Sequence, residues 1–351
     1  MTKDEKYIAR CIQLASNGIC NTAPNPMVGA VIVHRDTIIG EGYHIRCGEA
    51  HAEVNAIRSV KDERLLREAT IYVSLEPCSH YGKTPPCSDL IIEKGIPNVV
   101  IGCMDPFSLV AGRGIQKLRN AGINVTVGVL EKECQQLIQR FVVFNTLHRP
   151  FITLKWAESA DGFIDFKRSD GKPYIFSSPL TSMIVHKRRA EHDAILVGRK
   201  TALLDNPSLT IRNWAGKNPI RIVLDKNLTL PEHLSLFDGK VPTIVFTQQQ
   251  PPAPRRNISY FTLDFTQNIL PQMMEVLYHQ KIQSLLVEGG GRLIQSFIDN
   301  ELWDEAHIEK SNAYLYEGVK APIFPQRQHF LTEQKMGKEF KYAVKSPIKP
   351  T

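Results

Sequence analysis

The sequence lacks any apolar run long enough to cross a membrane, which would need about 18 uninterrupted apolar residues. Charged residues interrupt its beginning, and no apolar segment with a small-residue cleavage site follows, so we expect no signal peptide. Runs of five or more Lys and Arg, which are typical of nucleic-acid-binding arms, are also missing. We therefore expect a cytoplasmic protein that binds neither membrane nor nucleic acid.

Cysteine is absent after residue 134, although seven cysteines precede that point. An odd number without a secretion signal favours reduced thiols, metal ligands or core packing over disulfides. The uneven distribution indicates two different modules, and a length of 351 residues suits two domains of ordinary size. The net charge of +7 suits anionic partners such as phosphorylated metabolites, although solubility alone also explains it.

Alternating strand and helix patterns predict α/β structure in both modules. In the first module, a helix over 4–18 precedes a hairpin over 28–41, and further helices are expected to begin at His51 and Cys87. A strand is expected just after residue 150, so the segment 145–150 is the predicted boundary. We assign residues 1–146 to one domain and residues 150–351 to the other.

One histidine and two cysteines form the most specific pattern: His51-Ala-Glu53, then Pro77-Cys78, then Cys87. Three protein ligands leave the fourth zinc position open for water, and zinc makes that water acidic near neutral pH. Two positions along a helix separate side chains by about 200°, so Glu53 is predicted to move protons rather than bind metal beside His51. This order of residues is the signature of zinc nucleobase deaminases.

Two other interpretations of these residues remain open. The histidine and cysteines could be ordinary core residues, or they could hold a structural zinc with Cys47 as the nearest candidate for a fourth ligand. Eight residues separate Cys78 from Cys87, where the generic deaminase motif has two. That longer loop carries His80, Lys83 and Thr84, which suit a substrate phosphate but equally suit a solvent-exposed turn.

A glycine-rich strand-to-helix turn, VEGGGR, is the clearest pattern of the second module. Backbone N–H groups at such a helix start can hold phosphate, and glycines let the backbone come close. Arg292 adds a charge suited to the extra phosphate of NADP. A plain tight turn is the alternative interpretation.

In the first module, Cys87 lies at a predicted helix start. The helix dipole there is expected to favour the thiolate form of Cys87.

Together these motifs resemble the bifunctional riboflavin-biosynthesis deaminase–reductase family. The resemblance lies in PNPMVGAVIV, GEGYH, HAE and LEPCSHYGKTPPC, and later in LKWAESADG, VGRKTALLDNPSLTIR and VEGGGR. It implies a cytidine-deaminase-like three-layer α/β/α domain followed by a dihydrofolate-reductase-like α/β domain. The loop between the two cysteines, ending in TPPC, is typical of this family rather than of tRNA adenosine or cytidine deaminases.

The resemblance also implies a reaction sequence. The zinc site would deaminate 2,5-diamino-6-ribosylamino-4(3H)-pyrimidinone 5′-phosphate, and NADPH would then reduce the ribosyl group to give 5-amino-6-ribitylamino-uracil 5′-phosphate. The expected partners are therefore a phosphorylated pyrimidine and, as in the family, further copies of the chain in a homo-oligomer. A nucleic-acid deaminase of the tRNA type with an appended domain is the alternative.

Family positions can be carried over residue by residue. Zn²⁺ would be held by His51, Cys78 and Cys87, with Glu53 as the catalytic acid and base. The deaminase substrate would meet Asn25, His44, His80, Lys83 and Asp105. NADPH would meet Ala157, Ile175, Thr201, Asp205 and the stretch 290–296, which includes Gly290, Gly291, Arg292 and Leu293. The reductase substrate would meet Lys155, Arg189, Leu209, Arg212 and Glu288.

Four stretches depart from the family pattern, and the shortest change is Ser159-Ala160-Asp161-Gly162, where the family often has SLDG. Phe107 stands where the family has an Asn that could bond the substrate. The segment RSDGKPYIFSS (168–178) replaces the family's SGES-x-WITS, and the stretch 308–324 departs from its APxxxG pattern. These changes predict an altered substrate edge, and leave open a weakened or altered reductase.

Overall fold

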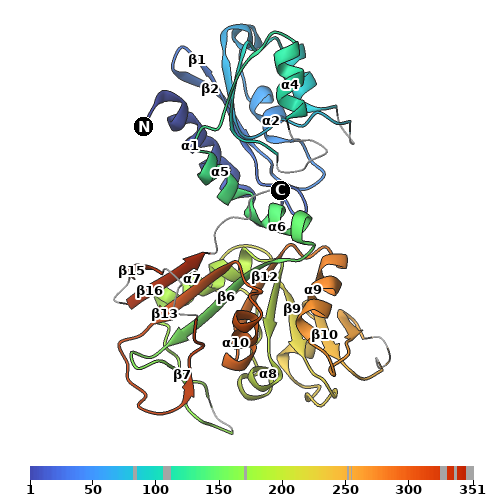
Figure 1. Cartoon of the computed structure of the whole chain (residues 1–351), viewed down its shortest axis with the longest axis vertical. Coiled ribbons are helices and arrows are strands. Elements are labelled where there is room, and N and C mark those ends of the chain that lie inside the picture. The colour runs from blue at the N-terminus through green and yellow to red at the C-terminus, as the bar shows by residue number, and fades with distance from the viewer. Residues whose placement is uncertain are drawn as a thin grey trace. The chain divides into compact units, whose positions relative to one another are not determined.

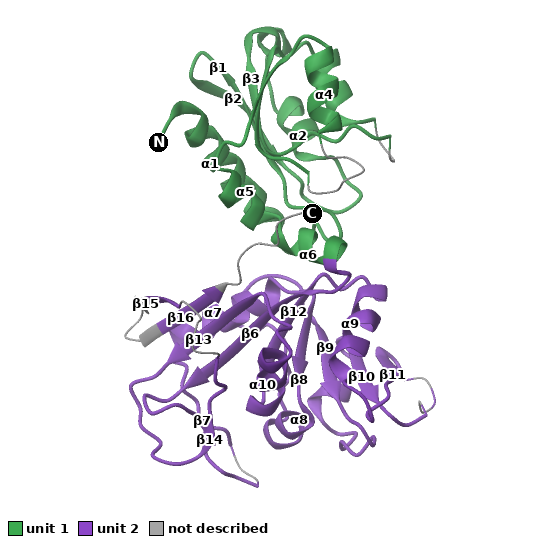
Figure 2. Ribbon diagram, viewed as in Figure 1, with its two compact units in different colours: residues 1–146, 347–351 green, residues 147–346 purple. Residues whose placement is uncertain are grey.

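The computed structural model describes residues 1–81, 85–105, 112–169, 172–250, 253, 255–324, 330–335 and 338–344. The chain divides into two compact units, Met1–Thr146 and Leu147–Ser346, which Figure 2 colours separately. Each unit contains its own sheet and hydrophobic core (Figure 1). No helix within the described ranges is both long and apolar enough to span a bilayer.

Unit 1 is built on a five-stranded sheet in the order β2-β1-β3-β4-β5. The first three of these strands pair antiparallel, and β3, β4 and β5 run parallel to one another. The strands are β1 (Gly29–His34), β2 (Thr37–Tyr43), β3 (Thr70–Leu75), β4 (Asn98–Cys103) and β5 (Asn124–Val127).

Helices cover both faces of this sheet, so unit 1 has three layers. One face packs apolar side chains against α2, α3 and α4, and the other packs against α1 and α5. The three-layer α/β/α prediction is thereby confirmed. The helices are α1 (Lys3–Ala15), α2 (Ala52–Arg58), α3 (Cys87–Glu93), α4 (Arg113–Asn120), α5 (Glu131–Leu137) and α6 (Gln139–Leu147).

Unit 2 contains a nine-stranded sheet in the order β11-β10-β9-β8-β12-β6-β13-β16-β15. Strands from β11 to β13 are parallel, while β16 and β15 add an antiparallel edge. The strands are β6 (Phe151–Glu158), β8 (Ala194–Val197), β9 (Ile220–Leu224), β10 (Thr243–Thr247), β11 (Ile258–Thr262), β12 (Ser284–Gly289), β13 (Glu305–Lys310), β15 (Leu331–Lys335) and β16 (Lys338–Val344); β7 (Phe163–Asp165) and β14 (Val319–Lys320) form a separate pair.

The two faces of the larger sheet differ in chemistry near β6. Ile152, Leu154 and Trp156 belong to the core formed with α9 (Ile269–His279) and α10 (Gly291–Asp299). Side chains alternate along a strand, so Thr153 and Lys155 point to the other face. There the hydroxyl of Thr153 contacts His192, just beyond α7 (Pro179–Ala190), at 2.9 Å. The polar side of β6 therefore lies beneath α7.

The sequence patterns located most of the elements, with two informative differences. The stretch TIYVSLEPC predicts a strand that ends at Cys78, whereas β3 ends at Leu75 and only the N–H of Glu76 still donates to the sheet, to the carbonyl of Cys103 at the end of β4. The helix α8 (Arg199–Asp205) was not predicted, although the motif VGRKTALLDNPSLTIR covers it, and strand β13 was not predicted either. Short elements that carry polar functional side chains show weak periodicity, which explains why both were missed.

Candidate functional sites

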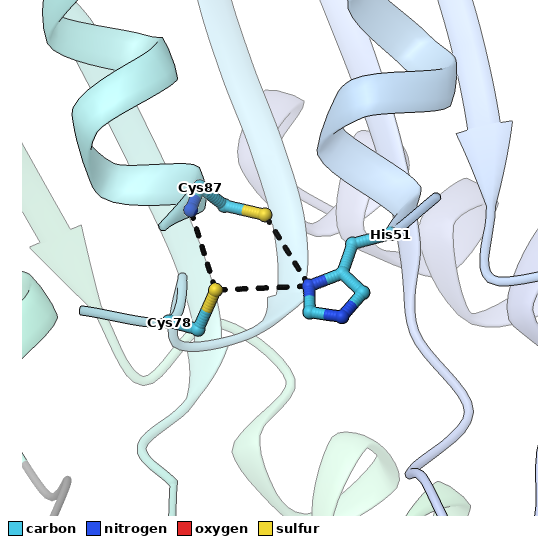
Figure 3. Close-up of side chains that lie close together, drawn as sticks. All are labelled: His51, Cys78 and Cys87. Carbon is cyan, nitrogen blue, oxygen red and sulfur yellow. Dashed lines mark hydrogen bonds between the residues drawn. The ribbon is translucent and has the colours of Figure 1, made fainter. Parts of the chain in front are cut away.

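Three side chains in unit 1 converge on one point, as Figure 3 shows. The ligand atoms of His51, Cys78 and Cys87 all lie within 4.8 Å of one another. Nδ1 of His51 lies 3.6 Å from the sulfur of Cys78 and 3.4 Å from that of Cys87. One imidazole and two thiols are the donor set of a three-ligand zinc site, so the residues present fit this metal.

Three separate pieces of chain position these ligands. His51 is the N-cap of α2, Cys87 is the first residue of α3, and Cys78 lies in the turn after β3. The backbone N–H of Cys87 donates to the sulfur of Cys78 at 3.3 Å. The start of α3 thus supports the Cys78 sulfur across the eight-residue insertion.

The side chains of the two cysteines are hydrogen-bonded to each other. A hydrogen bond with the Cys87 side chain lowers the pKa of Cys78 to about 4, and the His51 side chain and the Cys87 N–H act in the same direction. The pKa of Cys87 is raised by its hydrogen bond to Cys78 and by burial. The backbone N–H at the start of α3 is directed at the sulfur of Cys78 rather than at that of Cys87.

Glu53 lies in the first turn of α2 and is 3% exposed. Burial raises its pKa to about 7, with a further contribution from the neighbouring Cys78. Its carboxyl also forms a hydrogen bond with the side chain of Cys87. A carboxyl group that exchanges its proton near neutral pH beside a metal site suits a general acid and base.

A polar pair lies next to the ligand histidine. Nδ1 of His44 lies 3.1 Å from the carbonyl of Ala50, so this nitrogen carries the ring proton. Nε2 of His44 is then the acceptor for the Asn25 amide at 3.2 Å. The His44 and His51 rings meet edge to face at 5.4 Å. The structure therefore brings two predicted substrate residues, Asn25 and His44, to the metal centre.

Asn55, which sequence reasoning missed, holds this arrangement from α2. Its side-chain amide donates to the carbonyls of Tyr43 at 2.9 Å and Ala50 at 3.2 Å. The Ala50 carbonyl thus receives hydrogen bonds from both Asn55 and His44. One turn of helix separates Asn55 from His51, and that spacing was the available signal.

Glu76 was also missed. Its buried carboxylate accepts backbone N–H bonds from Gly112 and Gly114 at 2.9 Å and from Asp105 and Ile115 at 3.3 Å. A side chain on Gly114 would place Cβ only 2.1 Å from the Pro77 carbonyl oxygen. These contacts bind the start of α4 to the turn that carries Cys78. The acidic residue of the LEPC motif was the signal available.

The remaining predicted residues of this site are less enclosed. Asp105 is half-buried, and its N–H is fixed by Glu76. His80 is exposed in the turn after Cys78. Lys83 and Phe107 lie outside the described residues.

In unit 2, three predicted substrate residues lie on neighbouring elements. Arg189 of α7 and Glu288 of β12 form a two-pronged ion pair, with N–O distances of 2.6 and 3.0 Å. Lys155 on β6 is within electrostatic range of Glu288. Burial lowers the pKa of Lys155, and the carboxylates of Glu288 and Glu309 oppose that effect. The residues form a partly buried cluster of alternating charge.

The glycine-rich turn meets the start of α8 in the same unit. The carbonyl of Gly289 accepts the N–H of Gly198 at 2.8 Å, and a Cβ on Gly290 would lie 3.1 Å from the Thr201 hydroxyl. A Cβ on Gly291 would lie 3.0 Å from Ile164. Two predicted NADPH residues, Thr201 and Gly290, are thus in close approach. Backbone N–H groups at a helix start, where glycines add no side chains, can bind the phosphate of a dinucleotide.

The other predicted residues of unit 2 lie on several elements, and some of them are buried whereas others are exposed. Asp205 ends α8 and forms an ion pair with Arg168, from the segment that departs from the family pattern. Leu209 is buried in the core, whereas Ile175 is exposed. The backbone N–H of Arg212 donates to His186, and its guanidinium donates to Ser208 at 2.5 Å. Ala157 follows Lys155 on β6, and Arg292 and Leu293 are in the first turn of α10.

Comparison with known families matches both units. Residues 1–103 match the family model of the cytidine and deoxycytidylate deaminase zinc-binding region. Residues 150–311 match that of the RibD C-terminal domain. The first match covers His51, Cys78 and Cys87, and the second covers Lys155, Arg189 and Glu288.

Whole-chain relatives extend over both matches. The riboflavin biosynthesis protein RibD of Bacillus amyloliquefaciens is 41% identical over 313 residues, 87% of this chain and 83% of that protein. The crystal structure of a diaminohydroxyphosphoribosylaminopyrimidine deaminase/5-amino-6-(5-phosphoribosylamino)uracil reductase from Thermotoga maritima is 36% identical, with a TM-score of 0.89 over 98% of this chain and 99% of that one. A structure of Acinetobacter baumannii RibD is 30% identical, with a TM-score of 0.84 over 97% and 98% of the two chains.

Proposed function

We propose, because this chain belongs to the RibD family of riboflavin biosynthesis proteins, that it performs a deamination in residues 1–146 and a reduction in residues 150–351. The observation that carries the proposal is the convergence of His51, Cys78 and Cys87 beside the buried carboxyl of Glu53. A metal site of this composition, with an acid–base group next to it, is the arrangement that hydrolytic deamination requires.

The substrate of the first step is 2,5-diamino-6-ribosylamino-4(3H)-pyrimidinone 5′-phosphate. Zinc, when bound by the three ligands, supplies a water acidic enough to act as a nucleophile near neutral pH. Glu53 accepts a proton from that water and returns it to the departing amino group, which leaves as ammonia. Its pKa near 7 supports both transfers, because the carboxyl group exchanges protons readily at that pH.

Recognition in the first step falls to polar residues around the metal. Asn25 and His44 hold the ring, and their mutual hydrogen bond supports this role because it fixes the tautomer of His44. His80, Lys83 and Asp105 complete the set, with the cationic Lys83 suited to the 5′-phosphate.

The second step reduces the sugar. NADPH, when bound, supplies the hydride that converts the opened ribosyl group to ribityl at C1′. Its proposed binding residues are Ala157, Ile175, Thr201, Asp205, Gly290, Gly291, Arg292 and Leu293, with the close approach of Thr201 and Gly290 as support. Lys155, Arg189, Leu209, Arg212 and Glu288 bind the pyrimidine sugar phosphate. Positioning is the main task of these side chains, since the hydride comes from the cofactor.

The proposed partners are a phosphorylated pyrimidine of low molecular mass and other copies of the same chain, in a cytoplasmic location, with no role for nucleic acid. Deamination of structured RNA in place of the free nucleotide would instead support the alternative, a tRNA-type deaminase with an appended domain. The separate reductase family match in residues 150–311 argues against that alternative.

A coupled assay on the purified chain tests the proposal. The diamino-pyrimidinone ribosyl phosphate is supplied with and without NADPH, and ammonia release and NADPH oxidation are followed separately. Ammonia without NADPH, followed by NADPH oxidation when it is added, is the expected result. Absence of ammonia release contradicts the deaminase assignment, and ammonia without NADPH oxidation contradicts the reductase assignment.

A further inference from the structure

Glu309 is a buried acid on β13 that neither composition nor resemblance singled out. It is 3% exposed and lies in the stretch 308–324, which departs from the family's APxxxG pattern. Removing a carboxylate from water is unfavourable unless hydrogen bonds or opposite charges compensate. The partners of Glu309 therefore indicate what it is there to do.

Both carboxylate oxygens of Glu309 accept hydroxyl hydrogen bonds from the chain leading into α7. Ser177 Oγ donates to Oε2 at 2.6 Å, and Thr181 Oγ1 donates to Oε1 at 2.9 Å. Between these two donors, Ser178 caps α7 by accepting the N–H of Thr181 at 3.2 Å. Glu309 thus attaches the first turn of α7 directly to the sheet.

Two departures from the family pattern meet in this contact. Ser177 belongs to the replaced segment 168–178, and Glu309 belongs to the replaced stretch 308–324. They are 132 positions apart in sequence, yet their side chains form a short hydrogen bond. The contact therefore joins two stretches that both differ from the family pattern.

The same carboxylate faces Lys155. Strand β6 lies between β12 and β13 in the sheet, and Glu309 pairs in register with Ala157 while His307 pairs with Lys155. Glu288 on β12 and Glu309 on β13 both act electrostatically on the Lys155 ammonium, which also feels Arg188 and Arg189. Lys155 is therefore flanked by one carboxylate from each neighbouring strand.

We propose that Glu309 is a positioning residue of the reductase site, which fixes the first turn of α7 through Ser177 and Thr181 and holds the Lys155 ammonium opposite Glu288. The inference rests on the proposed role of Lys155 in binding the pyrimidine sugar phosphate. Glu309 touches neither substrate nor cofactor, and acts through the residues it holds. Its loss therefore weakens substrate binding while the NADPH site is unchanged.

The test compares three single variants of the full chain. Glu309→Gln keeps an acceptor for a hydroxyl but removes the charge beside Lys155, whereas Ser177→Ala keeps the charge and removes one hydrogen bond. Asp193→Asn is the matched control, because Asp193 also accepts a hydroxyl bond, from Ser284 at 3.0 Å, at the start of β8. Steady-state reduction gives KM for the pyrimidine and for NADPH, and ammonia release from the same samples reports on unit 1.

We expect KM for the pyrimidine to rise about tenfold in Glu309→Gln and about threefold in Ser177→Ala, within the range for the loss of one typical intramolecular hydrogen bond. KM for NADPH, ammonia release and the Asp193→Asn kinetics stay within about twofold of the wild type. The double variant Glu309→Gln/Ser177→Ala is less than additive, because the two residues share one interaction.

Three outcomes overturn the inference, and the measurements distinguish them. If the wild-type chain oxidises NADPH and both variants keep its pyrimidine KM, Glu309 has no positioning role although the reductase assignment stands. If the wild-type chain oxidises no NADPH, the proposed reductase function fails and the inference fails with it. Equal losses in Glu309→Gln and Asp193→Asn would show general destabilisation of unit 2 and also reject the positioning role.

Discussion

Arg189 is joined to Glu288 by two hydrogen bonds, from Nε at 3.0 Å and from Nη2 at 2.6 Å. Arg189 was predicted to bind the reductase substrate, and in the structure its guanidinium group is directed at the carboxylate of Glu288. Such a pair fixes the guanidinium and leaves Nη1 for the carbonyl of Thr210 at 3.3 Å. Arg189 thus joins α7, β12 and the segment after α8, and its removal affects structure as well as binding.

Arg189→Ala is expected to destabilise unit 2 by about 3–5 kcal/mol, because it leaves the Glu288 carboxylate buried without its partner. Reduction of the sugar should fall in parallel, while ammonia release persists because the metal ligands all belong to unit 1. Denaturant unfolding and the two separate activity assays measure this. Reduced ammonia release in a folded variant would contradict two independent sites.

Glu53→Gln is expected to keep zinc and to lose deamination by about 10²–10⁴-fold, the usual contribution of a general acid and base. The amide has nearly the same shape but cannot move a proton. Metal content by atomic spectroscopy and ammonia release measure the two effects. Glu63→Gln, at the start of an exposed helical turn, is the control. Loss of zinc from Glu53→Gln would reassign Glu53 as a ligand.

Cys87→Ser is expected to lose zinc and deamination together, whereas Cys47→Ser keeps both. Cys87 supplies one of three converging ligand atoms, and Cys47 is not part of that group. A chelator should reproduce the Cys87→Ser defect in the wild type, and added zinc should reverse it. Zinc loss in Cys47→Ser would mean a closed structural site with four ligands.

The alkaline limb of the reductase pH profile should move when Glu309 is changed. Burial lowers the pKa of Lys155, and Glu309 opposes that effect. Binding through the ammonium is lost as pH rises through this pKa, so Glu309→Gln should move the decline in kcat/KM to lower pH. Ser177→Ala keeps the charge and should leave the limb in place. A shift to higher pH would refute the assignment.

Arg292→Ala is expected to reduce the preference for NADPH over NADH by about tenfold, the order of one charge-assisted hydrogen bond. The side chain is exposed in the first turn of α10, so its removal leaves the fold intact. KM values for both cofactors measure the change. An unchanged ratio would show that the extra phosphate is bound elsewhere.

The metal site was predictable because its chemistry restricts residue type and order. A histidine, a glutamate two positions later and two cysteines can be recognised without knowing the fold. The hydrogen bond from the Cys87 N–H to Cys78 was not predictable, because it depends on how the start of α3 is oriented. Local helix reasoning considers only the first residue of the helix and so does not find the sulfur of Cys78 as the acceptor of this N–H group.

The residues that support the two sites were not predicted from the sequence, for a related reason. Glu76, Asn55 and Glu309 act through contacts with backbone or hydroxyl groups distant in sequence. An isolated Glu or Asn in a strand or helix has no spacing that marks such a role. In unit 2 the alternation along β6 predicts a buried strand, but the charges beneath α7 become visible only when β12 and β13 are placed beside it.

The ends of the loop between Cys78 and Cys87 are held independently of its length. Cys78 is fixed by the turn after β3, Cys87 by the start of α3, and the N–H···S bond joins them directly. Residues between two such anchors can be exchanged at small entropic cost, since closure depends only weakly on loop length. The residues that hold the metal and the residues that select the substrate can therefore change independently. The loop between Cys78 and Cys87 is thus a suitable segment to exchange when new deaminase specificities are engineered.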